Sequence, residues 1–352
     1  MLLSEYDYNL PENLIAQFPA DKRQNSKMMV LNRNTKAIEH KHFYDFSDLI
    51  DSNSVLVLNN TKVIPARLYG IKEETGAKIE IFLLKKSDNT DNTKLWECLI
   101  KPSKRVKTDT IIKISNELCA RVIKPLEDVG EWQIELIYNG ELMDILHRVG
   151  NIPLPPYIER KVQSEDIKKL DFERYQTVYA QDEGSVAAPT AGLHFTKEIL
   201  DKLKSKGVEI IYVTLNVGMG TFRPVKTEII EEHKMHSEEF EITQEAADAI
   251  NRAKNIGKKI IAIGTTSVRT LETCYKKHGK IIACKDNSEL FIYPPYEFGI
   301  VDEMITNFHL PKSTLLMLVS AFAGKDFIFE AYRQAIENNY RFFSYGDCMF
   351  IR

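Results

Sequence analysis

The side chains best suited to chemistry gather around one loop, residues 175–196, which reads YQTVYAQDEGSVAAPTAGLHFT. The middle of this loop has almost no side-chain bulk, and it delivers His194 just before Thr196, a favourable helix N-cap. Small residues let a backbone approach a ligand closely, and structured loops often carry functional groups. A surface linker could share this composition, but the aromatic residues, the histidine and the cap favour a functional loop.

A candidate anion site follows the predicted strand Lys259–Ile263, in the sequence GTTSVR. Backbone N–H groups at a helix start attract anions, and the hydroxyls of Thr265, Thr266 and Ser267 add donors. Arg269 offers a planar fork for a carboxylate or phosphate. The alternative is that Ser267 caps the helix and Arg269 lies on a solvated face. The segment is not a Walker A loop, because no Gly-Lys-Ser/Thr follows at the required spacing.

A glycine-punctuated loop, NVGMGTFRP at 216–224, follows another predicted strand. It contains Gly218 and Gly220 but lacks the third glycine of a dinucleotide fingerprint, and no helix begins there. A ligand loop of another kind is better supported. Phe222 could stack on a planar ligand, and Arg223 adds a cation.

Two further stretches carry histidines. His233 and His236 have a spacing that could suggest a metal, but the zincin pattern is absent, so we predict no metal site. Glu239 remains a candidate polar group because the following residues indicate a strand. His309 precedes a very apolar helix, where a loop histidine is well placed for acid–base or ligand work. The alternative is a histidine that caps the core.

A cluster of cations without an acidic neighbour lies at Lys101, Lys104, Arg105 and Lys107. Residues 67–148 contain as many acidic as basic side chains, so this cluster is a local patch suited to phosphates. An ordinary solvated turn is the competing interpretation.

The elements that must position these residues form two patterns. Residues 67–138 contain six short apolar stretches separated by turns, at 68–71, 78–84, 95–101, 110–114, 119–123 and 132–137, which predict a small closed β-barrel. After the loop at 175–196, helices and strands alternate, which predicts an α/β main domain with a mixed sheet and flanking helices. We therefore expect residues 1–66 and 149–352 to form the main domain and 67–148 an inserted barrel domain.

The overall composition restricts the class of protein. The chain has 352 residues and a formal net charge of -3, so any nucleic-acid binding must use a local patch and not the whole surface. Five cysteines without CxxC spacing indicate free thiols in a reducing compartment. No signal peptide or membrane-length apolar run is present, so we expect a cytoplasmic protein, by default a monomer.

Taken together, these stretches resemble one family. YDYNLPENLIAQFPADKR, LVLNNTKVIPARL, GNIPLPPYI, YQTVYA, GSVAAPTAGLHF, VGMGTFRPV, HSEEFEI, GTTSVRTLE and TNFHLPKSTLLMLVSAFAG occur in this order. The chain is similar to S-adenosylmethionine:tRNA ribosyltransferase-isomerases of queuosine biosynthesis over essentially its whole length.

The resemblance implies that the ribosyl moiety of S-adenosylmethionine is transferred to 7-aminomethyl-7-deazaguanine at the tRNA wobble position and isomerised to give epoxyqueuosine. Adenine and methionine are released, S-adenosylmethionine is a cosubstrate, and no metal is implied. A base must remove a proton beside the sulfonium, and adenine must be protonated as it leaves.

For this chemistry the acid–base candidates are His194, Glu239 and His309. The substrate-binding candidates, for the methionine carboxylate, for stacking and for close approach, are Tyr175, Thr190, Gly192, Phe195, Gly218, Gly220, Phe222, Arg223, Thr265, Thr266, Ser267 and Arg269. The barrel cations are the tRNA-binding candidates. Two other functions compete: an S-adenosylmethionine-dependent tRNA methyltransferase, which usually has a glycine-rich first loop that is missing here, and a non-catalytic tRNA-binding protein.

Overall fold

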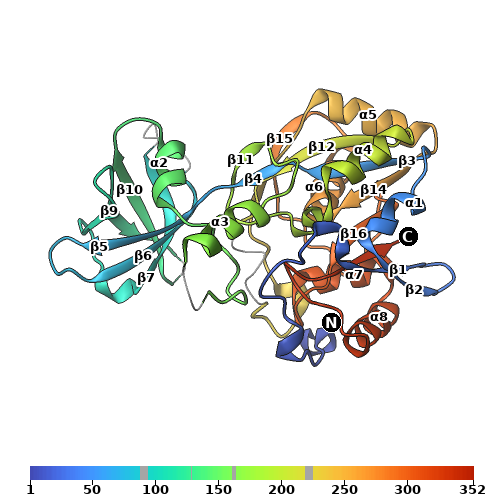
Figure 1. Ribbon diagram of the computed structural model, residues 1–352, viewed down its shortest axis with the longest axis horizontal. Helices are drawn as coiled ribbons and strands as arrows, with labels where there is room; N and C mark the ends of the chain where they lie inside the picture. The colour runs from blue at the N-terminus through green and yellow to red at the C-terminus, as the bar shows by residue number, and fades with distance from the viewer. Residues whose placement is uncertain (88–93, 128, 161–163, 219–224) are drawn as a thin grey trace.

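The computed structural model describes residues 1–87, 94–127, 129–160, 164–218 and 225–352. These residues form two lobes along the long axis of the molecule (Figure 1). One lobe is a closed barrel and the other is a mixed sheet with helices on both faces. The predicted fold class is therefore confirmed.

The larger lobe is built on a nine-stranded sheet with the order β15-β13-β12-β3-β14-β16-β17-β1-β2. The central strands β12, β3, β14 and β16 pair in parallel, and the strands outside them include antiparallel pairs. The bounds are β1 Lys27–Leu31, β2 Ile38–His42, β3 Ser54–Asn59, β12 Glu209–Leu215, β13 Glu238–Ile242, β14 Lys259–Ile263, β15 Cys284–Ser288, β16 Glu303–Asn307 and β17 Cys348–Ile351.

Both faces of this sheet are covered, which explains why β3 is apolar at nearly every position. Val55 and Val57 point into one core, which also contains side chains of α5 to α8. Leu56 and Leu58 point into the opposite core, beneath α4 and the aromatic segment around α1. The helices are α1 Phe46–Leu49, α4 Lys197–Ser205, α5 Gln244–Asn255, α6 Gly264–His278, α7 Thr314–Ala323 and α8 Lys325–Glu337.

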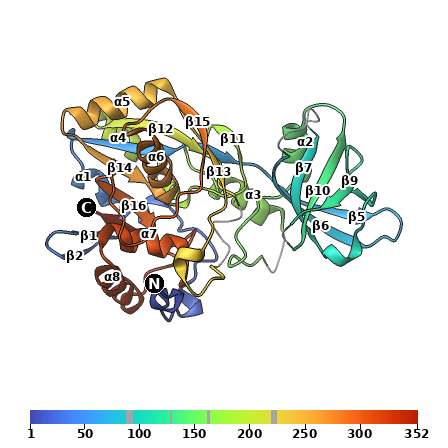
Figure 2. The same cartoon turned by 180° about the vertical axis from the view of Figure 1, so that it is seen from behind.

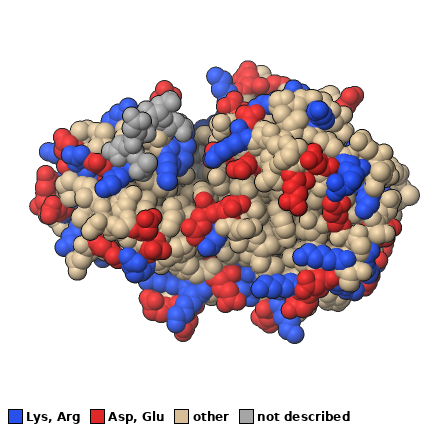
Figure 3. Space-filling model, turned by 90° about the horizontal axis from the view of Figure 1, so that it is seen from above, with Lys and Arg blue, Asp and Glu red and all other residues tan. Residues whose placement is uncertain are grey.

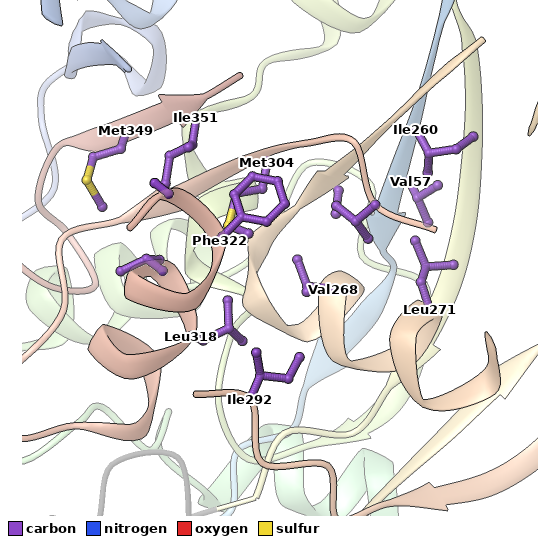
Figure 4. Packing of buried hydrophobic residues seen from close by; sticks show 14 of the residues in the cluster. Val57, Ile260, Val268, Leu271, Ile292, Met304, Leu318, Phe322, Met349 and Ile351 are labelled. Atoms are coloured by element: carbon purple, nitrogen blue, oxygen red, sulfur yellow. The ribbon is translucent and has the colours of Figure 1, made fainter. Parts of the chain in front are cut away.

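The first of these cores joins the strands to α6 and α7. Val57 and Ile260 from the sheet pack near Val268 and Leu271 of α6, and Leu318 and Phe322 of α7 complete the contact (Figure 4). Burial of such side chains contributes about 1.5–3 kcal/mol each. This packing fixes the positions of the first turns of both helices relative to the strand ends.

The smaller lobe is a closed antiparallel barrel with the strand order β10-β7-β6-β5-β8-β9. Its interior is filled by apolar side chains, and α2 covers one end with Leu142, Ile145 and Leu146. The bounds are β5 Arg67–Lys72, β6 Lys78–Lys86, β7 Leu95–Lys101, β8 Ile111–Lys113, β9 Leu118–Pro125, β10 Glu131–Tyr138 and α2 Leu142–Val149. All six predicted strands are present, each within a few residues of its predicted bounds.

The chain segments that lead into and out of the barrel lie side by side. Arg67 and Asn151 exchange two backbone hydrogen bonds, at 3.1 and 2.9 Å. Between the lobes lie α3 (Glu165–Arg174) and a parallel pair of short strands, β4 (Thr61–Val63) and β11 (Asp182–Ser185), as both views show (Figures 1 and 2). This arrangement is compatible with an inserted barrel; the division at 66/67 and 148/149 stays a prediction.

Several helices begin at hydroxyl side chains that cap their first turn, as predicted for Thr196. The hydroxyls of Thr196, Thr243 and Ser313 accept hydrogen bonds from first-turn N–H groups, as expected of N-caps. Asp326 does not cap α8, because that helix already begins at Lys325 after Gly324. Near the N-terminus, residues Glu12–Leu14 form a single 3-10 turn.

Among the described residues, no helix has both the length and the apolar character to cross a lipid bilayer.

A substitution at Gly150 should show how tightly the segments that enter and leave the barrel, around Pro65 and Gly150, are packed against each other. A methyl group at Gly150 would lie 2.2 Å from the carbonyl oxygen of Pro65 and 2.7 Å from that of Leu146. Because backbone atoms cannot rotate away, we expect Gly150→Ala to lower the free energy of unfolding by about 3 kcal/mol, the upper end of overpacking costs. Urea unfolding at equilibrium measures this.

The matched control is Gly257→Ala, where φ is 75° but no atom lies within 4 Å of the added methyl. Its cost should stay near 1 kcal/mol, from backbone strain alone. Equal losses in the two variants would contradict close packing at the junction.

Candidate active site

A cavity with about 630 Å³ of empty volume lies at the carboxyl ends of the parallel strands β12, β14 and β16. In open α/β sheets this edge is where ligands bind. The cavity is lined by Tyr157, Ala188, Pro189, Thr190, Ala191, Val217, Gly264, Thr265, Thr266, Thr306, Asn307, Phe308, His309, Leu310, Ser313, Leu315, Phe343 and Ser344. It therefore joins six stretches that are far apart in the sequence, including the predicted functional loop.

The first turn of α6 forms one part of the wall. Ile263 occupies the N-cap position and its side chain cannot cap, and no acidic residue lies in the first turn. Gly264 has a φ of 88°, which turns the chain sharply from β14 into the helix. The N–H groups at this helix start carry partial positive charge. The hydroxyl of Thr266 is buried and has no hydrogen-bond partner among the described residues, so it is available to a ligand.

A second helix start lies on the same cavity. Ser313 lines it and caps α7, accepting a hydrogen bond from the N–H of Leu316 at 3.2 Å. The first turn of α7 also lacks an acidic residue. Two helix N-termini thus contribute to one cavity, which favours a ligand that carries negative charge.

The segment 188–192 supplies a wall of small side chains, in a 3-10 turn that spans Thr190–His194. Ala188, Thr190 and Ala191 line the cavity directly. Gly192 is required by packing, because a Cβ there would lie 2.1 Å from the hydroxyl oxygen of Tyr179. The small side chains of Ala188 and Ala191 therefore leave room in the cavity for a ligand, as predicted. The absence of a side chain at Gly192 instead leaves room for Tyr179.

His309 lies at the end of β16, with its side chain on the cavity. Its Nε2 is 2.9 Å from the hydroxyl oxygen of Thr306, and no other side chain in the described part of the chain bonds to the ring. Burial lowers the pKa of His309 to about 3, so the imidazole is neutral near pH 7. A neutral ring with one nitrogen free of protein partners can exchange a proton or a hydrogen bond with a ligand.

His194 lies behind the cavity wall, where both of its ring nitrogens have protein partners. Asn307 donates its amide N–H groups to the carbonyl oxygens of Phe343 and Ser344, at 2.8 and 3.3 Å, so its Oδ1 must accept. His194 Nε2 donates to that oxygen at 3.1 Å, and Nδ1 accepts from the hydroxyl of Ser26 at 2.8 Å. Burial lowers the pKa of His194 to about 4, which keeps this neutral tautomer.

The structure brings together only part of the predicted site. Thr190, Thr265, Thr266 and His309 line the cavity, and Gly192 and Gly218 are sequence neighbours of lining residues. The N–H of Gly218 donates to Glu238 at 3.0 Å. Gly220, Phe222 and Arg223 lie outside the described residues.

Four predicted residues are committed to packing or to internal bonds. Tyr175 is fully buried, with its ring edge-on to Tyr345, and Phe195 is fully buried among Phe43 and Phe46. Neither ring can stack on a ligand without leaving the core. The hydroxyl of Ser267 donates to the carbonyl oxygen of Ile263 at 2.9 Å, one helical turn back. Arg269 is 4% exposed and forms an ion pair with Glu238.

Glu239 does not reach the cavity, because it points to the opposite side of β13. Its side chain is 46% exposed and lies 3.1 Å from Lys285 Nζ. Side chains alternate along a strand, so Glu238, Phe240 and Ile242 share the buried face. Because Phe240 and Ile242 are apolar, the same alternation could have identified Glu238 as the inward-facing carboxylate from the sequence alone.

Sequence reasoning also missed Asn307, Ser344 and Tyr157, which line the cavity. Asn307 lay within the TNFHLPKS stretch, but nothing in its spacing indicated a bond to His194. The four barrel cations Lys101, Lys104, Arg105 and Lys107 are all exposed and lie in the other lobe. Within the described ranges, no group of three or more His, Cys, Asp or Glu side chains is arranged to hold a metal ion.

The cavity at the edge of the parallel strands and the separate barrel lobe define a class of two-lobed α/β proteins. Comparison with known proteins shows to which family in this class the chain belongs. A family model described as "Queuosine biosynthesis protein" matches residues 3–351. The chain therefore belongs to the queuosine biosynthesis protein family.

A solved structure gives a more particular likeness. The chain is 37% identical to an S-adenosylmethionine tRNA ribosyltransferase from Thermotoga maritima, a crystal structure at 2.00 Å resolution, with a TM-score of 0.54. The match covers 99% of this chain and 100% of that one.

The ion pair of Arg269 and Glu238 should matter for stability. Both side chains are at most 4% exposed, and Arg269 also donates to the carbonyl oxygen of Ser288 at 3.2 Å. Removing one partner leaves a buried charge without compensation, so Arg269→Met should lower the free energy of unfolding by about 3–5 kcal/mol. Denaturant titration measures the loss.

The double variant Arg269→Met with Glu238→Gln removes both charges and should recover part of that stability. A double variant as unstable as the sum of the two single variants would contradict this explanation.

The two buried histidines should make stability fall in mild acid. Both folded-state pKa values, about 4 for His194 and about 3 for His309, lie below the ordinary value near 6.5. The unfolded chain then binds more protons, so each histidine contributes stability above pH 6.5 that is lost as pH falls toward 4. Between pH 7 and 5 the expected loss is on the order of 2 kcal/mol for each histidine.

Urea unfolding at the two pH values measures this dependence, with carboxylates contributing equally to all variants. The pH dependence of His194→Gln and of His309→Gln should be smaller than that of the unsubstituted protein. Parallel pH profiles for all three proteins would show that these histidines are not buried in the neutral form.

Proposed function

We propose that this protein transfers the ribosyl moiety of S-adenosylmethionine to 7-aminomethyl-7-deazaguanine at the wobble position of tRNA and isomerises it, releasing adenine and methionine. The observation that carries the proposal is a cavity with an uncapped helix start, hydroxyl donors and a neutral histidine, in a chain matched almost end to end by the queuosine biosynthesis family. The likeness to a tRNA ribosyltransferase at 37% identity supports the same reaction.

The methionine carboxylate is best placed at the start of α6. The N–H groups of Thr265 and Thr266 lack a side-chain cap, and the free hydroxyl of Thr266 adds a donor. Charge-assisted hydrogen bonds of this kind are about twice as strong as neutral ones. Arg269, whose guanidinium already binds Glu238, supports this turn from inside the protein and does not bind the carboxylate.

The nucleoside part fits the wall of small and apolar residues. Ala188, Thr190 and Ala191 allow close approach of a ribose, and Val217 and Phe343 offer apolar surface to a planar base. The predicted residues Gly220, Phe222 and Arg223 lie outside the described residues and stay candidates from the sequence.

The reaction needs a base for the proton beside the sulfonium and an acid for the departing adenine. His309 is the acid–base candidate that lines the cavity, and its Nδ1 has no hydrogen-bond partner in the described chain. Burial keeps the imidazole of His309 neutral near pH 7, which is the form that can accept a proton. The side chain of Glu239 lies on the exposed face of β13, where it pairs with Lys285, so it does not take this part.

His194 acts as a positioning residue in this proposal. Its two hydrogen bonds fix Asn307, whose side chain also ties β16 to the segment before β17. Asn307 and Ser344 border the cavity, so His194 determines the shape of that wall.

The tRNA is the second substrate, and the barrel cations remain candidates for its backbone. Lys101, Lys104, Arg105 and Lys107 have no carboxylate within ion-pair distance among the described residues. On the face shown in Figure 3, basic and acidic side chains are intermixed, so binding must depend on local groups of cations. A monomer in the cytoplasm stays our expectation.

One assay separates this function from its competitors. The protein is incubated with S-adenosylmethionine and tRNA that carries the aminomethyl base, and the products are separated by chromatography. Adenine with methionine supports the proposal, and omission of the tRNA should stop their release. Adenosylhomocysteine would indicate a methyltransferase, and RNA binding without turnover would indicate a non-catalytic binding protein.

Substitutions of residues that line the cavity should change either kcat or KM, depending on the role of the residue. We expect His309→Gln to lower kcat for adenine release about 10²- to 10⁴-fold, the usual contribution of an acid–base group, with little change in the KM of S-adenosylmethionine. Thr266→Val should mainly raise that KM, because it removes a donor to the bound substrate. Steady-state kinetics measures both effects.

The control is Glu239→Gln, which lies outside the cavity and should retain near-normal kinetics. His194→Ala should release little adenine while keeping its fold. Near-normal turnover of either histidine variant would remove that residue from the mechanism.

A further inference from the structure

A second, smaller cavity adjoins the proposed active site. It opens to solvent, encloses about 260 Å³ when the space at its mouth is included, and is lined by Pro19, Ala20, Arg23, Ser26, Arg174, Leu193, His194, Ser344, Tyr345 and Gly346. Ser344 lines both cavities, and the hydrogen-bonded pair His194–Asn307 separates them. A ligand that occupied both cavities would therefore lie against the His194–Asn307 pair.

The walls of the second cavity carry positive charge without a matching negative one. Arg23 and Arg174 both line it, and none of its lining residues is acidic. Their guanidinium groups donate only to backbone carbonyls: Arg23 to Leu193 and Glu173, at 3.2 and 2.9 Å, and Arg174 to Asp21 and Ala20, at 3.3 and 2.6 Å.

The two guanidiniums also act on each other unfavourably. The pKa of Arg23 is lowered, first by burial and then by the charge of Arg174. The charge of Glu173 offsets this effect only in part, since the pKa of Arg23 stays lowered, and Asp171 is bound to Arg160 by two hydrogen bonds. Arg174 Nε is buried and has no partner in the described chain. An anion in the cavity would remove this repulsion.

An exposed aromatic ring stands beside these arginines. Phe18 is 48% exposed, which is unusual for a ring of this size, and it precedes Pro19 of the cavity. One side of the ring is covered by the Arg160 guanidinium, 4.7 Å from the ring centre. Arg341 donates to the carbonyl oxygen of Phe18 and adds a third cation. Cations interleaved with an exposed ring are the arrangement that binds single-stranded RNA.

We propose that Arg23, Arg174, Arg341 and Phe18 form an RNA-binding rim, in which the guanidiniums take a phosphodiester next to the modified nucleotide and Phe18 stacks on a neighbouring base. The inference rests on the proposed function, since it assumes that the larger cavity holds the wobble base. A base turned out of the anticodon loop keeps its phosphates a short distance away. The rim adjoins the cavity through Ser344 and the His194–Asn307 pair, so it lies where those phosphates must pass.

The test measures binding of a fluorescently labelled anticodon stem-loop RNA, with the aminomethyl base, by anisotropy over a range of salt concentrations and without S-adenosylmethionine. Arg23→Gln and Arg174→Gln should each weaken binding roughly tenfold and reduce the slope of log Kd against log salt by about 0.7–0.9, the value for one lost phosphate contact. Phe18→Ala should weaken binding roughly tenfold with no change of slope.

The matched control is Arg333→Gln, which removes one charge from α8, where Arg333 is paired with Glu330 and Glu337. It should leave both Kd and slope unchanged. If the arginine variants unfold at lower temperature, Phe18→Ala decides, because that exposed side chain donates no hydrogen bond.

Unchanged affinity and slope in the rim variants would overturn the inference, even with an active enzyme. The opposite failure is equally distinct: an unsubstituted protein that binds the RNA through the rim but releases no adenine in the product assay would defeat the proposed function and leave the rim intact.

Discussion

Parallel pairing of the central strands is the constraint on which the rest of this structure depends. Strands β12, β3, β14 and β16 run in one direction, so their carboxyl ends meet at one edge of the sheet. Each connection must leave from that edge, and two of the helices that follow begin beside it. Their first N–H groups cannot all be satisfied within the helix, and the protein leaves those of α6 without a side-chain cap. The polarity of the site is thus a direct result of sheet topology.

The same edge explains the buried histidines. β16 ends at Asn307, where the chain must bond both to the segment before β17 and to the loop at 188–194. Burial keeps His194 neutral, and the acceptor Oδ1 of Asn307 selects the tautomer that has its proton on Nε2. His309 is two residues further on, and its backbone N–H donates to the hydroxyl of Tyr332 at 2.8 Å. Both ring nitrogens of His194 are therefore hydrogen-bonded to protein groups, whereas for His309 only Nε2 is, among the described residues.

Much of the fold could be predicted from the sequence because local signals agreed with the tertiary structure. Thr196, Thr243 and Ser313 mark helix starts by their own hydrogen bonds, and the barrel strands are separated by clear turns. The site was harder to predict, since the residue types do not say which side of an element faces the cavity. Glu239 and Glu238 differ by one position and point in opposite directions. Arg269 looked available for a ligand because its partner is 31 residues away and comes from another strand.

The loop that precedes β1 has a consequence for how this protein tolerates sequence change. Arginines from three distant segments, Arg160, Arg174 and Arg341, donate to the backbone carbonyls of residues 17–21. A carbonyl is the same for nearly every residue type, so these bonds depend on the path of the chain and not on its side chains. Side-chain replacements at Ala20 or Asp21 leave every bond in place, whereas deletion of a single residue would displace all of them together. In this loop a change of length is therefore more disruptive to the fold than a change of side chain at Ala20 or Asp21.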